Sequence, residues 1–172
     1  MLAVFLLVFS MVALTSGVLN VISNHQDSYH ASSQDNLLQG SCCPSGWTPI
    51  NGRCFLYVAS EMSWAKAEKN CLSLGANLAS IHNVNEYHQV QALITAASRG
   101  SGQTWIGASD AEQERTWLWS DGSPMIYTNW CRGQPDNWKG NQNCVVMNYQ
   151  DNKCWDDHTC DVSLPSVCAR TV

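Results

Sequence analysis

The segment NWCRGQPDNWKGNQNCVVM, residues 129–147, places a Gln-Pro-Asp triplet, two tryptophans and two cysteines in a polar loop that leads into a β-prone run. A loop of this composition is either a solvated surface excursion or a site whose amide and carboxylate oxygens hold a ligand. Two short runs rich in tryptophan and aspartate flank it, WLWSDGSP at residues 117–124 and CWDDHTC at residues 154–160. The choice between the two readings depends on whether the fold brings these oxygens together.

The chain contains nine cysteines within its 172 residues. In an oxidising compartment such a density predicts a disulfide framework. A zinc site formed by Cys154, His158 and Cys160 is the alternative, but a paired C-x-x-C element is missing and oxidation disfavours the thiolates that zinc requires. The odd number leaves one thiol over. Cys42, next to Cys43 at the edge of the domain, is the expected remainder and could link two chains or form a disulfide with a small thiol.

The N-terminal part differs in composition from the rest. Residues 1–17 (MLAVFLLVFSMVALTSG) are apolar and end in small residues, which predicts a signal peptide, with an N-terminal anchor as the alternative. Residues 18–41 are polar and poor in aromatic side chains, which predicts a propeptide or a flexible arm. The compact domain is expected at residues 42–172 of a secreted, extracellular protein without a membrane span. The net charge of −5 and the scattered Lys and Arg residues argue against nucleic acid as a partner.

Local patterns predict an α+β fold in which a hairpin precedes two helices, and short strands then alternate with irregular loops. Turn residues at 50–52 and a β-prone run at 54–58 predict the hairpin. Residues 62–75 predict a first helix that begins at Ser63, with an apolar face of Trp64, Ala67, Cys71 and Leu74. Residues 83–98 predict a second helix that begins with a capping box of Asn83 and Glu86. Its predicted apolar stripe consists of Val90, Leu93, Ile94 and Ala97.

Six motifs follow one another in a fixed order: WIG at 105–107, WLWSDGSP at 117–124, NW at 129–130, QPDNW at 134–138, NCVVM at 143–147 and CWDDHTC at 154–160. Together they resemble the C-type lectin-like domain family, including its small soluble fish lectins and its type II antifreeze proteins. The resemblance covers nearly everything from Cys43 to Ala169. It implies a C-type lectin-like fold, with two helices flanking short antiparallel sheets and long irregular loops braced by disulfides.

The resemblance also implies a pairing of the cysteines, namely Cys43–Cys54, Cys71–Cys168 and Cys144–Cys160, with Cys131–Cys154 similar to an extra bridge of type II antifreeze proteins. The Cys71–Cys168 bridge would close a long loop, and in the loop-entropy model such closure contributes roughly 4–5 kcal/mol. Bridges of this kind allow the loops to stay irregular, and irregular loops can present ligands.

A calcium site is implied by the same resemblance. Calcium takes about six to eight oxygens from carboxylates, amides, carbonyls and water. The implied ligands are Gln134, Asp136, Gln142, Asp156 and Asp157. Three clustered aspartates repel one another without a cation, which favours either an ion or a wide separation. Pro135 resembles the cis-proline of the family, which turns both flanking side chains to one side.

Carbohydrate binding would use largely the same residues. In the family, two adjacent sugar hydroxyls bind the calcium ion and hydrogen-bond to its ligands, and a Gln-Pro-Asp triplet resembles the galactose type. The implied carbohydrate-binding residues are Gln134, Asp136, Trp138, Gln142 and Asp156. Trp138 stands where galactose-binding members stack a ring on the sugar, and core packing is the alternative role for it. The expected partners are galactose-type glycans on glycoproteins or microbial surfaces.

Two positions depart from the galactose-type pattern. That pattern pairs a glutamate with an asparagine, whereas Gln142 and Asp156 stand at the matching positions here. The formal charge is unchanged, but the hydrogen-bond polarity is reversed because an amide donates and a carboxylate only accepts. We expect calcium affinity to be kept and sugar orientation or selectivity to shift.

Three other functions compete with a lectin. Ice binding is disfavoured because residues 137–143 (NWKGNQN) lack threonine and carry Trp138 and Lys139. A lectin-like module that binds protein usually lacks an intact sugar motif, which this chain has. An enzyme is not expected, because there is no G-x-S-x-G signature or convincing nucleophile pair, and of five histidines only His158 lies near the acidic cluster, where a loop position is expected.

Overall fold

The computed structural model describes residues 43–172. The expected signal peptide at 1–17, the expected arm at 18–41 and Cys42 lie outside the described residues. The helices are α2 (Trp64–Ser73), α3 (Val84–Ser98) and the short 3-10 helix η1 (Trp138–Gly140). The strands are β1 (Thr48–Ile50), β2 (Arg53–Met62), β3 (Asn77–Leu78), β4 (Thr104–Ser109), β5 (Leu118–Trp119), β6 (Cys144–Tyr149), β7 (Cys154–His158) and β8 (Leu164–Thr171). Within the described part, no helix has the length and apolarity needed to cross a membrane.

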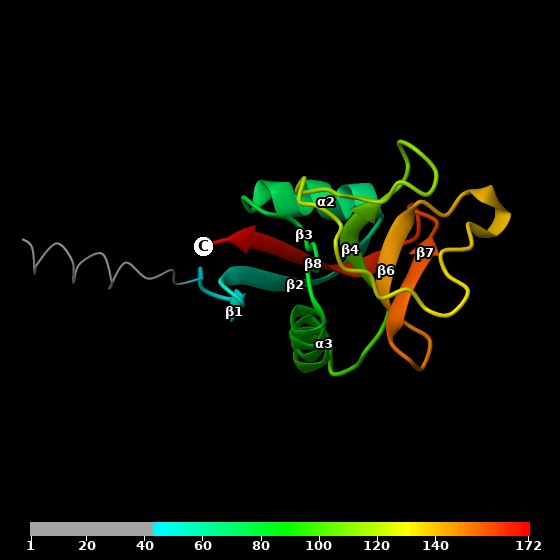
Figure 1. Ribbon diagram of the computed structural model, residues 1–172. Coiled ribbons are helices and arrows are strands. Elements are labelled where there is room, and N and C mark those ends of the chain that lie inside the picture. The colour runs from blue at the N-terminus through cyan, green and yellow to red at the C-terminus, as the bar shows by residue number, and fades with distance from the viewer. Residues whose placement is uncertain (1–42) are drawn as a thin grey trace, which may run out of the picture. The chain divides into compact units, whose positions relative to one another are not determined.

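The strands form one eight-stranded sheet rather than several short ones. Its order is β1-β2-β8-β4-β6-β7, with β3 paired to β8 and β5 paired to β4. All pairs are antiparallel except β4 with β8, which are parallel. Helices α2 and α3 lie on opposite sides of the β2–β8 part (Figure 1). The α+β class is confirmed, and the sheet is mixed because β4 enters beside the C-terminal strand.

The predicted hairpin and the second helix form for the expected local reasons, whereas the first helix lacks the expected side-chain cap. Asn51 and Gly52 both have positive φ, 49° and 76°, which is the backbone that a two-residue hairpin turn needs. The Asn83 side chain accepts a hydrogen bond from the Glu86 backbone N–H at 2.9 Å and caps α3. Ser63 has an extended N-cap backbone, but its side chain makes no cap hydrogen bond. Hence backbone conformation alone marks the start of α2.

The helix faces differ in part from the predicted stripes. Ala67 and Cys71 of α2 are buried, whereas Leu74 is 41% exposed because the helix ends before it. In α3, Val90 and Ile94 are buried and Ala97 is exposed. The buried part of α3 includes Glu86, which forms an ion pair with Arg53 of β2 at 3.0 Å. A buried charge with a direct partner avoids the cost of an isolated one.

The WIG motif holds the centre of the sheet. Trp105 is fully buried, and its indole N–H donates to the backbone oxygen of Met62 at 3.0 Å. In the other direction, the Trp64 indole N–H donates to the backbone oxygen of Ile106 at 2.9 Å. A Cβ at Gly107 would lie 2.5 Å from the backbone oxygen of Leu78, so only glycine fits between β4 and the β3 segment.

Four disulfides brace the domain, and they are the four pairs that the resemblance implies: Cys43–Cys54, Cys71–Cys168, Cys131–Cys154 and Cys144–Cys160. Cys71–Cys168 ties α2 to β8 across 97 residues. Cys131–Cys154 lies at the end of the β6–β7 hairpin where β7 begins, and Cys144–Cys160 lies at the end where β6 begins. Because Cys154 and Cys160 are both oxidised, the zinc site considered above has no thiolate ligands.

Candidate functional site

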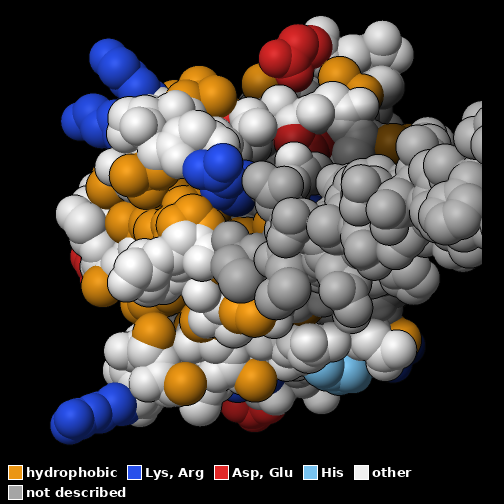
Figure 2. Space-filling view, turned by 90° about the vertical axis from the view of Figure 1, so that its left-hand side faces the viewer, with side chains coloured by type: hydrophobic (Ala, Val, Ile, Leu, Met, Phe, Trp, Pro, Cys, Tyr) orange, Lys and Arg blue, Asp and Glu red, His pale blue; other side chains and the backbone are white. Residues whose placement is uncertain are grey.

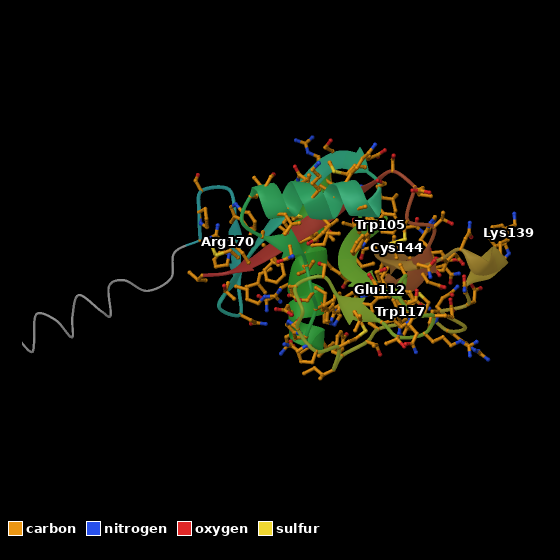
Figure 3. The ribbon with its side chains drawn as sticks, turned by 90° about the horizontal axis from the view of Figure 1, so that it is seen from above. Trp105, Glu112, Trp117, Lys139, Cys144 and Arg170 are labelled. Carbon is orange, nitrogen blue, oxygen red and sulfur yellow. A yellow bond between two sulfur atoms is a disulfide. The ribbon has the colours of Figure 1, made fainter. Side chains whose placement is uncertain are left out.

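A pocket of about 360 Å³ lies at the Gln-Pro-Asp loop. The residues that line it are Gln134, Asp136, Trp138, Gln142, Tyr149, Asp156, His158 and Thr159. The loop lies at the end of the domain opposite the C-terminus, as the positions of Lys139 and Arg170 show (Figures 1 and 3). All five residues expected to contact carbohydrate therefore share one pocket. The peptide bond between Gln134 and Pro135 is cis.

Asp157, the remaining expected calcium ligand, has a different place. Its side chain is fully buried and is not among the groups that line the pocket. One carboxylate oxygen accepts from the backbone N–H of Asp136 at 3.0 Å and the other from that of Asn137 at 2.6 Å. Such hydrogen bonds satisfy a buried carboxylate. Asp157 therefore fixes the loop backbone beside the pocket, and each of its oxygens keeps a further lone pair.

Gln142 is a second tie between the loop and β7. Its side-chain amide donates to the backbone oxygen of Asp157 at 2.8 Å, while its carbonyl oxygen accepts from the backbone N–H of Trp138. A glutamate could not make the first of these bonds, because a carboxylate has no donor. The hydrogen bonds of this loop therefore require an amide at position 142, because the side chain has to donate as well as accept.

Two oxygens of residues that line this pocket lack hydrogen-bond partners in the structure. The Oε1 atom of Gln134 and the Oδ1 atom of Asp156 are buried and accept no hydrogen bond. Both residues line the pocket together with Asp136. Buried acceptors without a donor are costly, and a cation is one group that can satisfy them. The donor set of amide and carboxylate oxygens therefore fits a hard cation such as calcium.

Electrostatics around Asp156 lead to the same conclusion. Burial, together with the nearby carboxylates of Asp157 and Asp136, raises the pKa of Asp156 to about 7. The predicted repulsion among the three aspartates is thus relieved in two ways without an ion: Asp157 is capped by N–H groups, and Asp156 takes up a proton near neutrality. Across residues 43–172, no three His, Cys, Asp or Glu side chains are grouped to hold a metal by themselves, so amide oxygens have to complete any site.

Trp138 forms the exposed wall of the pocket. It is 61% exposed, which excludes the core-packing alternative. The Lys139 ammonium lies 4.1 Å from the centroid of its ring, a cation–π contact. Both residues belong to η1, which projects outward from the sheet (Figure 3). The indole ring is therefore held beside the pocket with part of its surface open to solvent.

Tyr149, His158 and Thr159 also line the pocket. The sequence placed His158 near the acidic cluster without a role in binding, and it did not indicate Tyr149 or Thr159. His158 is the last residue of β7 and pairs with Cys144, so the expected loop position is wrong. Its ring packs edge-on against Trp105 at a centroid distance of 5.9 Å. The β-pairing of residues 154–158 with β6 could have been suspected only from the two flanking cysteines.

A larger hollow of about 520 Å³ lies elsewhere in the domain and includes Arg53, His82, Asp121 and Arg170 in its wall. Arg170 lies at the end opposite Lys139 (Figure 3), and that end shows hydrophobic side chains interspersed with basic ones (Figure 2). Ser80 contacts the His82 ring at 3.1 Å, but it is fully buried and already bonded to Arg53. A buried hydroxyl with these partners stabilises the local structure and is not accessible as a nucleophile.

Comparison with known proteins agrees with this geometry. A family model described as the lectin C-type domain matches residues 60–170. Ladderlectin of Oncorhynchus mykiss is 39% identical over 96% of this chain and 91% of its own length. The galactose-specific lectin nattectin of Thalassophryne nattereri is 40% identical, over 77% of this chain and 82% of its own.

Solved structures of type II antifreeze proteins have the same fold. One described as calcium-dependent has a TM-score of 0.70 and 40% identity, and covers 75% of this chain and 100% of its own. One described as calcium-independent has a TM-score of 0.69 and 37% identity, and covers 76% of this chain and 95% of its own. Fold, motifs and relatives agree, and the chain belongs to the C-type lectin domain family.

Proposed function

We propose that this protein is a secreted, calcium-dependent lectin that binds galactose-type glycans in the pocket of the Gln-Pro-Asp loop. The family is a carbohydrate-binding, non-enzymatic one. The observation that carries the proposal is the pair of buried, unpartnered oxygens on Gln134 and Asp156, which line the same pocket as Asp136 and the exposed Trp138.

Calcium would be held by oxygens of Gln134, Asp136 and Asp156. Gln142 and Asp157 would add further oxygen ligands. Each oxygen of Asp157 and the carbonyl oxygen of Gln142 accepts one hydrogen bond and retains a lone pair. When bound, the ion supplies open coordination positions for sugar hydroxyls. It would also favour the ionised form of Asp156, because a cation offsets the burial and the neighbouring carboxylates that raise the pKa of this side chain to about 7.

Selectivity for the sugar would depend on Trp138, Gln142 and Asp156. Stacking of a sugar's apolar face on an aromatic ring contributes on the order of 1 kcal/mol beyond area burial. Because an ionised Asp156 beside calcium only accepts hydrogen bonds, whereas the asparagine that the resemblance implies also donates, it would favour a hydroxyl that donates to it. Because the hydrogen-bond polarity at Gln142 and Asp156 is reversed, we expect a galactose-type ligand to bind in an orientation shifted from that in the galactose-type pattern.

Ice binding is the alternative that the type II relatives raise. Residues 137–143 present Trp138 and Lys139 at the outer end of the domain, and an aromatic ring and an ammonium match a flat lattice of ice poorly. Thermal hysteresis at millimolar calcium concentration would establish ice binding in place of the lectin function. A role as a module that binds protein ligands would show as binding that neither free sugar nor chelator displaces.

Residues 1–17 would direct secretion as a signal peptide, and residues 18–41 would form a propeptide or arm. Eight of the nine cysteines are paired in the described domain. Cys42 is the ninth, and we propose that it links two chains. Paired domains would raise avidity, which a single shallow site needs for firm glycan capture.

Chromatography on galactose-agarose and mannose-agarose, with elution by chelator or by free sugar, tests the proposed function. We expect retention on galactose-agarose in calcium and release by either chelator or galactose. Retention on neither resin would refute the proposal, and equal retention on mannose-agarose would refute the galactose class.

A further inference from the structure

Asn137 uses all four of its polar groups. Its backbone N–H donates to Asp157 at 2.6 Å, and its backbone oxygen accepts from Gly140 at 2.8 Å. Its side-chain oxygen accepts from the backbone N–H of Gln142 at 3.1 Å. The side-chain amide donates to Glu114 at 2.6 Å. Of these four bonds, only the last connects Asn137 to the segment that follows β4.

The position of Asn137 makes these bonds relevant to the pocket. It stands between Asp136 and Trp138, two residues that line the pocket, and has a left-handed backbone with φ 44° and ψ 49°. The Trp138 backbone N–H donates in turn to the Asp136 carboxylate at 3.1 Å. A rotation of Asn137 would therefore move a candidate calcium ligand and the candidate stacking ring together.

Glu114 belongs to a segment that is itself well fixed. The buried carboxylate of Asp110 accepts from the backbone N–H of Arg115 at 2.7 Å and from the side-chain amide of Asn143 at 2.9 Å. Asn143 directly precedes β6. These hydrogen bonds fix the backbone of residues 110–115. Glu114 is an exposed charged acceptor on this segment, and it reaches the pocket loop through its bond to Asn137.

We propose that Glu114 is a positioning residue for the saccharide pocket, acting through Asn137. It is not among the residues that line the pocket. Its bond to the Asn137 side chain holds the loop so that Asp136 and Trp138 face the pocket together. This inference rests on the proposed lectin function for its effect on sugar affinity, but its effect on the loop can be measured without sugar.

Three variants separate this role from simpler ones. Glu114→Ala removes the acceptor, whereas Glu114→Gln removes the charge and keeps an oxygen that can accept. Glu112→Ala is the control, because Glu112 is an exposed acid of the same segment. If Glu114 acted only by attracting a cation, the Ala and Gln variants at position 114 would be equally impaired.

The measurements are the dissociation constant for galactose in calcium, the melting temperature, and amide hydrogen exchange at residues 136–142. For Glu114→Ala we expect roughly five- to tenfold weaker galactose binding and faster exchange, with a nearly unchanged melting temperature, as befits one exposed charged hydrogen bond. Glu114→Gln should regain most of the affinity, and Glu112→Ala should match the parent.

Unchanged exchange at residues 136–142 in Glu114→Ala would overturn the proposal, whether or not the parent binds galactose. Faster exchange with unchanged galactose affinity would overturn it as well, because the loop would then tolerate the loss. Absence of galactose binding by the parent is a different result, which refutes the proposed lectin function and leaves the exchange comparison to decide the role of Glu114 in the loop.

Discussion

The side-chain amide of Gln142 donates a hydrogen bond to the backbone carbonyl oxygen of Asp157, with an Nε2–O distance of 2.8 Å. Backbone carbonyls are among the oxygens that calcium accepts as ligands. Gln142 thus occupies an oxygen next to the pocket and ties the η1 loop to β7. The glutamine that stands where the resemblance implies a glutamate therefore stabilises this loop through a donor that a carboxylate lacks.

Gln142→Glu should destabilise the calcium-free protein and strengthen calcium binding. The carboxylate cannot donate to the Asp157 carbonyl and adds a negative charge near Asp136 and Asp156, at a cost of about 1–3 kcal/mol. Thermal unfolding in chelator should show a lower melting temperature, and calcium should raise it by more than in the parent. Gln89→Glu, the same change at an exposed position of α3, should alter neither value. A Gln142→Glu variant as stable as the parent in chelator would contradict the role of this amide.

Asp156 should make the stability of the calcium-free protein fall as pH rises. Its folded pKa of about 7 lies above the ordinary value of 3.8 for an aspartate, so folding takes up a proton between these pH values. The contribution is fully present below pH 3.8 and is lost as pH rises through 7. Asp156→Asn should therefore gain stability relative to the parent between these pH values and reach a plateau above 7. Melting curves in chelator at several pH values check this, and a pH-independent difference would contradict it.

Restoring the family's donor–acceptor polarity should sharpen galactose binding. The double change Gln142→Glu and Asp156→Asn keeps the net charge and exchanges the amide and the acid. We expect tighter galactose binding and a larger preference over mannose in competitive elution. Asp156→Asn alone removes a charge and should weaken calcium binding. If the double variant alters neither calcium nor sugar affinity, these two side chains do not belong to the site.

Cys42 should join two chains. Non-reducing gels of the secreted protein are expected to show a dimer that reductant or Cys42→Ser converts to monomer. Glycan retention on a dense galactose surface should decrease with the loss of the dimer, while the affinity for free galactose stays the same. A parent protein that is monomeric without reductant would refute the link.

Elements with local signals were predictable from the sequence. The Asn51-Gly52 turn and the Asn83 cap each depend on residues within one turn of chain, and both occur as expected. The extent of the apolar helix faces was less predictable. Leu74 has the right spacing, but α2 ends before it, and where a helix ends depends on its packing in the domain.

The family resemblance implied five of the residues that line the pocket, but it implied neither the other three nor the hydrogen bonds around the pocket. The family resemblance implies that Gln134, Asp136 and Asp156 lie near one another, but the role of Asp157 depends on backbone N–H groups that lie 20 and 21 residues earlier in the chain. The pairing that puts His158 at the end of β7 likewise arises from a register between two strands. Such contacts are set by tertiary structure, and local sequence carries little information about them.

Calorimetric titration of calcium into the purified protein, with and without galactose, tests the central claim most directly. We expect one calcium ion per chain, tighter binding in the presence of galactose, and at least about tenfold weaker binding after Asp136→Asn, which removes a charged ligand. Galactose binding that persists in chelator, or calcium binding that Asp136→Asn leaves unchanged, would contradict a shared calcium and sugar site at this loop.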